Sequence, residues 1–246
     1  MRILLSMLLL VLASQQSAAQ SYGAFDMGAL TNTLAQDHVT RQSQSAAPPA
    51  PLDRFGGGFS RLLQGQRQAA PAGYAAPFTP SPETRARLAE AMADAAARRD
   101  PGQAEAMREL VLSGRAIAEY ERVLPSVGLD PHDAVDALAF SLLVHWGVAV
   151  DTRAPVTGAQ AAGVRRQAAN AYLAVAEQLP TQAARQEFAQ ALAIEAVILA
   201  GTHEAAVRAD DRAALERYSR IARQRGRLLF GVDPAQLELT DGGFVP

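Results

Sequence analysis

The chain has 246 residues, a formal net charge of −2 and no cysteine. This length fits one domain of average size together with some unstructured sequence. The near-zero net charge gives no general attraction to nucleic acid, and the lack of cysteine excludes disulfides, thiolate metal sites and cysteine nucleophiles.

Residues 1–19 have the pattern of a signal peptide. Arg2 supplies a positive charge, residues 3–13 form an almost unbroken apolar run, and residues 17–19 are the small residues that signal peptidase reads. The apolar run is about 11 residues, well short of the roughly 20 that a spanning helix needs. We therefore expect cleavage after Ala19 and a periplasmic or secreted bacterial protein without a transmembrane anchor.

Residues 20–78 are predicted to form a largely disordered tail. Residues 42–51 are rich in Gln, Ser, Ala and Pro, and residues 64–77 are rich in Gln, Ala, Gly and Pro. Such segments bury too little apolar surface to offset the entropy of ordering. The folded domain is expected to span residues 79–246.

This domain has repeated helix start and stop signals. Ser81 followed by Pro82 is a typical N-terminus, and Gly114, Gly128 and Gly231 stand where helices should end. No alternating strand pattern is present. The pattern predicts an all-α bundle of about six to seven helices. The expected helices span 82–98, 101–112, 115–126, 131–150, 158–178, 182–208 and 211–230.

The helices at 131–150 and 182–208 are predicted to lie at the centre of the bundle, because both are apolar nearly all round. We expect Trp146 to be buried against the second of them. Gly147 and Gly201 interrupt these helices at a cost, so each marks either a close approach of a neighbouring helix or a kink.

Glu195 is the main candidate for chemistry. It falls in the middle of an apolar face with Phe188, Leu192 and Leu199, so it must be paired, hydrogen-bonded or protonated. Its candidate partners are His145 and arginine side chains of a neighbouring helix. The functional interpretation is a general acid or a metal ligand in a closed cleft, and the alternative is a structural polar group that fixes the register of the helix.

No other motif indicates catalysis, a cofactor or a metal. The sequence contains neither a His-Glu-x-x-His pattern nor a Gly-x-Ser-x-Gly turn. One further surface, an arginine face, is a candidate site for an anionic partner. The simpler interpretation is a solvated face that is partly neutralised by its own residues, because Glu216 can pair with Arg220. This arginine face consists of Arg212, Arg220, Arg223 and Arg227.

The ends of the domain carry a family resemblance. Residues 78–85 (FTPSPETR), the helix that carries Trp146, and residues 239–244 (LTDGGF) together resemble an uncharacterised family of exported, all-helical bacterial proteins, a domain of unknown function. The resemblance implies export and a helical fold, and it implies no activity.

Three functions remain open at this stage. The leading hypothesis is a non-enzymatic exported domain that binds an unknown macromolecule in the cell envelope or outside the cell. The alternatives are an envelope hydrolase that uses Glu195 and a carrier of an apolar ligand. A filled core favours the first, a cleft with converging acids the second, and an apolar cavity the third.

Overall fold

A computed structural model of the chain describes residues 69–98 and 100–246. The predicted signal peptide, residues 1–19, and residues 20–68 of the predicted tail lie outside the described residues. The α-helices are α5 (Pro82–Ala97), α6 (Ala104–Leu112), α7 (Arg115–Val123), α8 (Ala134–Ala149), α9 (Gly158–Tyr172), α10 (Gln182–Arg208) and α11 (Arg212–Phe230). The short 3-10 helices are η1 (Pro101–Gln103), η2 (Leu124–Val127), η3 (Ala176–Gln178) and η4 (Pro234–Gln236).

The predicted helical bundle is confirmed, and its helices begin where local capping begins. The side chains of Ser81, Thr157 and Thr181 each accept a hydrogen bond from a backbone N–H of the first turn. Helix α8 starts later than the predicted residue 131, because Asp133 caps it by accepting from the N–H groups of Val135 and Asp136.

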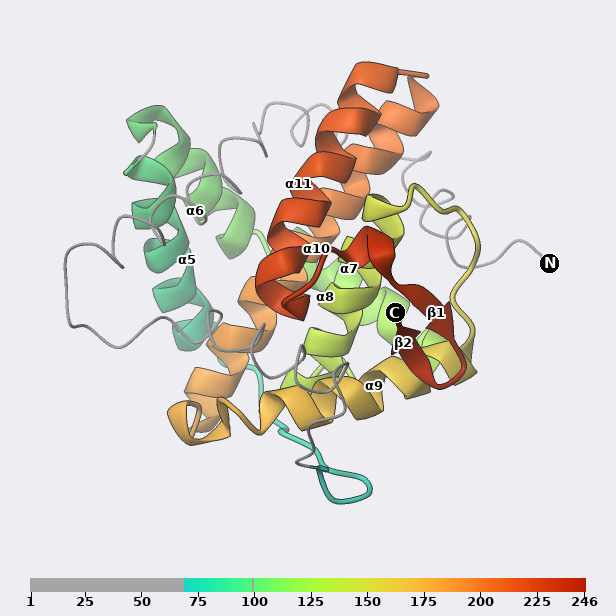
Figure 1. Cartoon of the computed structure of the whole chain (residues 1–246). Coiled ribbons are helices and arrows are strands. Elements are labelled where there is room, and N and C mark those ends of the chain that lie inside the picture. The colour runs from blue at the N-terminus through green and yellow to red at the C-terminus, as the bar shows by residue number, and fades with distance from the viewer. Residues whose placement is uncertain (1–68, 99) are drawn as a thin grey trace, which may run out of the picture.

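Helices α8 and α10 pack together at the centre of the molecule, and α9 and α11 cover α8 (Figure 1). The antiparallel pair α5 and α6 lies at one side of the bundle. Most of α8 is buried on every side, including Val135, Leu138 and Leu142. The prediction that these two helices are central is thus confirmed.

A small β-hairpin, which the sequence pattern does not predict, follows the helices. Strands β1 (Glu238–Thr240) and β2 (Gly243–Val245) pair antiparallel and lie against α9 (Figure 1). Gln167 of α9 holds the hairpin, since its side chain donates to the Phe244 carbonyl and accepts from the Phe244 N–H, both at 2.8 Å.

Residues 69–78 pack on the domain, although the sequence assigns them to the disordered tail. Ala76 and Phe78 are buried, and the Phe78 N–H donates to the His132 carbonyl at 2.9 Å. The Ala76 N–H donates to the Asp133 carboxylate at 2.8 Å. The folded region therefore begins upstream of the predicted boundary at residue 79.

Close helix contacts occur at glycines other than those predicted. A Cβ added at Gly201 would meet nothing within 4 Å, and one at Gly147 would meet only the Thr152 side chain at 3.8 Å. By contrast, a Cβ at Gly163 would lie 2.6 Å from the Asp241 carbonyl oxygen, and one at Gly226 would lie 2.5 Å from Pro234. Glycine thus lets the hairpin approach α9 and lets η4 approach α11.

Candidate functional site

Glu195 is buried at the centre of the bundle, as predicted, and its partner is Arg225. Glu195 is 9% exposed on α10, and Arg225 is 3% exposed on α11. The guanidinium binds the carboxylate through two hydrogen bonds, Nε to Oε1 at 2.6 Å and Nη2 to Oε2 at 3.0 Å. This is the bidentate geometry that makes an arginine–carboxylate pair strong.

His145 of α8 lies beside this pair and is fully buried. Its Nδ1 donates to the Ser141 carbonyl at 2.7 Å, because a carbonyl oxygen only accepts. Its Nε2 is 3.9 Å from Oε1 of Glu195, which is too long for a hydrogen bond. The two candidate residues are therefore neighbours, but Arg225 is the group that neutralises Glu195.

The electrostatics of Glu195 suit a structural ion. Burial by itself would raise the pKa of Glu195, but the positive charge and hydrogen bonds of Arg225, with a further contribution from the neighbouring His145, outweigh burial and hold that pKa at about 2. A general acid at neutral pH needs a raised pKa instead. Glu195 is ionised at neutral pH, and its pairing ties α10 to α11.

A separate apolar pocket lies along α8. Its volume is about 130 Å³. Neither Glu195 nor His145 lines it. Its walls come from α7, η2, α8, the segments before and after α8, and α10, and they include Val127, Leu129, Phe140, Val144, Trp146 and Val156.

The pocket explains why α8 has a second apolar face. Phe140 and Val144 point away from the side of α8 that carries Leu138 and Leu142, and they are only partly buried. No helix covers them fully, because the pocket lies there. The all-round apolar character of α8 thus serves both the core and the wall of a cavity.

Trp146 contacts the C-terminal segment of the chain. It is partly buried, lines the pocket, and packs against Phe244 of the hairpin with ring centroids 5.9 Å apart. Its indole N–H donates to the Leu237 carbonyl at 2.9 Å. Trp146 is thus partly buried, and the ring contact and hydrogen bond that the structure gives for it come from the C-terminal segment, which the sequence did not predict.

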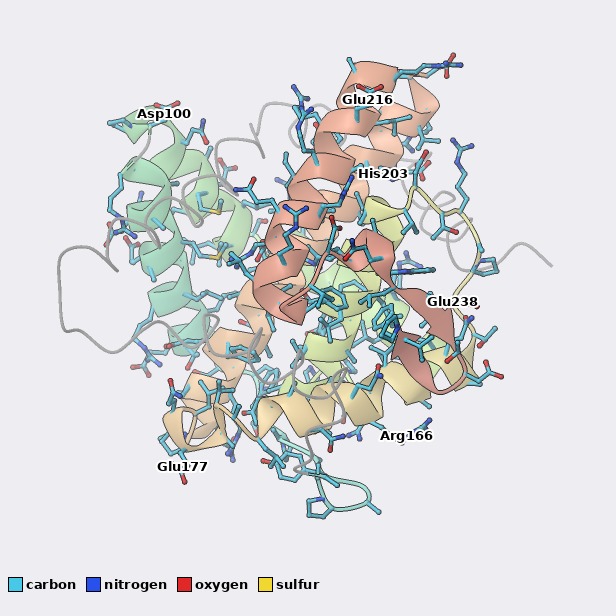
Figure 2. The ribbon with its side chains drawn as sticks, in the orientation of Figure 1. Asp100, Arg166, Glu177, His203, Glu216 and Glu238 are labelled. Carbon is cyan, nitrogen blue, oxygen red and sulfur yellow. The ribbon has the colours of Figure 1, made fainter. Side chains whose placement is uncertain are left out.

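Two polar side chains of α10, His203 and Glu204, line one part of the pocket. His203, which lies on α10 (Figure 2), is buried. Its Nε2 is 2.8 Å from the carboxylate of Asp151, which follows α8. The next residue, Glu204, is also buried and lines the pocket. Burial raises the pKa of Glu204, although the charges of Arg208, His203 and Arg153 oppose that shift.

The predicted arginine face is divided in the structure. Arg223 and Arg227 both bind the carboxylate of Asp233, at 2.7 Å and 2.8 Å. Arg212 and Arg220 are exposed, and within the described residues neither forms an ion pair, including the expected pair of Glu216 with Arg220. Only these two remain available to an anionic partner.

In residues 69–98 and 100–246, no group of three or more His, Asp or Glu side chains is placed to hold a metal ion. Over the same ranges, no helix has the length and apolar character required to cross a bilayer.

Sequence reasoning allowed for an arginine of a neighbouring helix beside Glu195 but did not identify Arg225, and it missed Glu204. Arg225 is four residues from both Ile221 and Leu229, so it lies on the buried face of α11, and that spacing is a usable signal. Glu204 has no comparable signal, because the pocket forms only when α7, η2, α8 and α10 pack together.

Fold and site together define an all-helical domain with an ion pair in its core and an apolar pocket beside a tryptophan. The chain belongs to the family described as "Family of unknown function (DUF6683)", which it matches over residues 1–245. A search of curated proteins and a search of solved structures each gave no match.

Proposed function

We propose that this domain binds a small, mostly apolar ligand in the pocket beside α8 and catalyses no reaction on it. The observation that carries the proposal is a cavity of about 130 Å³ with mainly apolar walls. Helix α8 contributes three of its apolar side chains, Phe140, Val144 and Trp146. Ligand sites are typically concave and apolar with a few polar groups. A dry apolar cavity of roughly 150 Å³ holds one benzene molecule, so the size of this pocket is close to that of a single six-membered ring.

The hydrolase hypothesis lacks comparable support. Glu195 is bound by Arg225 and does not line the pocket. A catalytic carboxylate must come within hydrogen-bonding distance of its substrate. The acid that lines the pocket, Glu204, has no second acid among the lining residues.

The test of this proposal is direct binding of cyclohexane and toluene. Trp146 is the only tryptophan in the chain and lines the pocket, so a ligand should change its fluorescence. Saturation-transfer NMR would report the same binding independently. Val144→Phe should fill the pocket and abolish binding, whereas Leu112→Phe, at an exposed apolar residue outside the pocket, should leave binding unchanged.

The outcome against the proposal is equally clear. If neither these hydrocarbons nor a hydroxyl-bearing analogue of the same ring binds, or if Val144→Phe and Leu112→Phe bind equally well, the pocket is not a ligand site.

We also propose that the chain is exported. Support comes from the pattern of Arg2, the apolar run at 3–13 and the small residues at 17–19. Mass spectrometry of the protein expressed in a bacterial host should give a mature chain that begins at Gln20. A chain that keeps Met1 and stays in the cytoplasmic fraction would contradict export.

Docking to an anionic macromolecule is a second candidate, and it rests on Arg212 and Arg220. Both are exposed, and neither has an ionic partner among the residues that the structure describes. Phosphatidylglycerol vesicles are a suitable probe. Arg212→Gln with Arg220→Gln should weaken association, whereas Arg87→Gln, which removes an exposed arginine on α5, should not. An equal loss of vesicle association in both variants would show that the association depends on net charge and not on this surface.

A further inference from the structure

The pocket contains one polar side chain whose hydrogen-bonding capacity is not met. Glu204 is 4% exposed, and within the described part of the chain its Oε1 has no hydrogen-bond partner. Buried carboxyl oxygens are nearly always bonded, so an unbonded one calls for an explanation. A ligand group that donates a hydrogen bond would provide it.

The neighbouring polar groups do not satisfy Glu204. His203 is adjacent in sequence, but its Nε2 binds Asp151 across the end of the pocket at 2.8 Å. The other polar lining side chain, Thr152, accepts the Ala154 N–H through its hydroxyl. Glu204 is therefore the polar lining group that is left for a ligand.

The surroundings of Glu204 discriminate between donor groups. Arg208 and Arg153 act on Glu204 electrostatically, so positive charge is already present nearby. An ammonium group would be repelled by them and would lose its hydration in a mostly apolar cavity. A carboxylate has no proton to donate and would face a second carboxyl group. A hydroxyl group donates a hydrogen bond and brings no charge.

We propose that the ligand is a ring-sized amphiphile whose neutral hydroxyl group donates a hydrogen bond to Oε1 of Glu204. Its apolar part lies against Phe140, Val144 and Trp146. This inference rests on the proposed function, since it names the class of ligand for the same pocket.

The experiment compares four ligands that share one ring. They are cyclohexane, cyclohexanol, cyclohexylammonium and cyclohexanecarboxylate, and none absorbs where tryptophan fluoresces. Binding to the full chain is measured through Trp146 fluorescence and saturation-transfer NMR. Glu204→Leu should weaken cyclohexanol about tenfold, as expected for loss of a hydrogen bond to a carboxyl group, and should leave cyclohexane unchanged or tighter.

A second variant guards against misfolding. Glu204→Gln keeps the shape and a carbonyl acceptor, so it should retain most of the affinity for cyclohexanol. Circular dichroism of both variants should match that of the unsubstituted chain.

The outcomes separate the two proposals. If no ring compound binds, the pocket is not a ligand site and both proposals fail. If cyclohexane binds but Glu204→Leu affects cyclohexanol and cyclohexane equally, only the hydroxyl inference fails. If Glu204→Leu weakens cyclohexylammonium more than cyclohexanol, the ligand is a cation and the hydroxyl inference is again overturned.

Discussion

The pair of Glu195 and Arg225 shows how a charged side chain is accommodated in an alanine-rich core. Removing two charges from water is costly, and the cost is recovered only when geometry is good and both groups are neutralised. The two hydrogen bonds between these side chains, at 2.6 Å and 3.0 Å, meet that condition. Each of the two side chains therefore neutralises a buried charge that the other one brings into the core.

This dependence gives a prediction for single and double variants. Glu195→Gln should cost about 3–5 kcal/mol of unfolding free energy, because it leaves Arg225 buried without a counter-ion. The double variant Glu195→Leu with Arg225→Leu should be close to the unsubstituted chain in stability, or above it. Urea denaturation followed by circular dichroism measures both. A double variant that is less stable than Glu195→Gln would contradict this account.

A second residue-scale prediction concerns acid. Hydrogen bonds from Arg223, outweighing partial burial, hold the pKa of Asp233 at about 2, below its ordinary value of 3.8. A lowered pKa in the folded state adds stability above pH 3.8 that is lost as pH falls toward 2. Asp233→Asn should therefore lower the melting temperature at pH 7, and the difference should shrink toward pH 2.

The control for this prediction is Glu216→Gln on α11. Glu216 is exposed and forms no ion pair with any residue that the structure describes, so its replacement should cause no comparable difference at pH 7. Parallel pH profiles for Asp233→Asn and the unsubstituted chain would contradict the assignment.

At the scale of elements, helices could be predicted and the hairpin could not. Helix ends depend on local groups such as Ser81 and Thr181, and α10 matches the predicted range. Strands β1 and β2 have three residues each, too few to show an alternating pattern. The Asp241-Gly242 turn is a usable hairpin signal, but it is one dipeptide.

The same contrast applies to the candidate site. The burial of Glu195 follows from its position on the apolar face of its helix, so it could be predicted from the sequence. Its pairing with Arg225 and the pocket beside Trp146 depend on how separate helices pack, and the sequence of a single helix contains no such information.

The glycine contacts allow a matched test between two helices. Gly163→Ala should destabilise the fold by about 1–3 kcal/mol, because the new methyl group meets the backbone of the hairpin turn. Gly201→Ala should stabilise it by up to about 1 kcal/mol, because α10 gains helix propensity and the methyl group meets nothing within 4 Å. Thermal melting of both variants checks the signs. Equal shifts in the same direction would show that packing at Gly163 is not decisive.

At the scale of the whole molecule, residues 69–78 link distant parts of the fold. The Ala76 carbonyl accepts from the Ala134 N–H at 3.0 Å, and the side chain of Phe78 is buried. The start of α8 therefore depends on a segment that lies before α5 in the chain. The N-terminal boundary of the folded domain therefore lies upstream of Phe78.

Truncation tests this boundary. The chain from residue 69 should be about as stable as the full chain, and the chain from residue 79 should lose roughly 3 kcal/mol or more through Phe78 and the hydrogen bonds of Ala76. Guanidinium denaturation of the two fragments gives the comparison. If the two fragments were equally stable, the folded domain would begin at residue 79.

The position of α8 in the chain has a consequence for synthesis. Helix α8 is apolar nearly all round, and although α7 and residues 69–78 also touch it, the elements that cover most of it, α9, α10, α11 and η4, follow it in sequence. A nascent chain that emerges from its N-terminus exposes α8 before any of these partners exists. Exposed apolar surface of this kind is where aggregation begins. Ribosomal pausing between α8 and α11 would prolong that exposure, so the yield of this protein should depend on a chaperone that holds α8 until α11 has emerged.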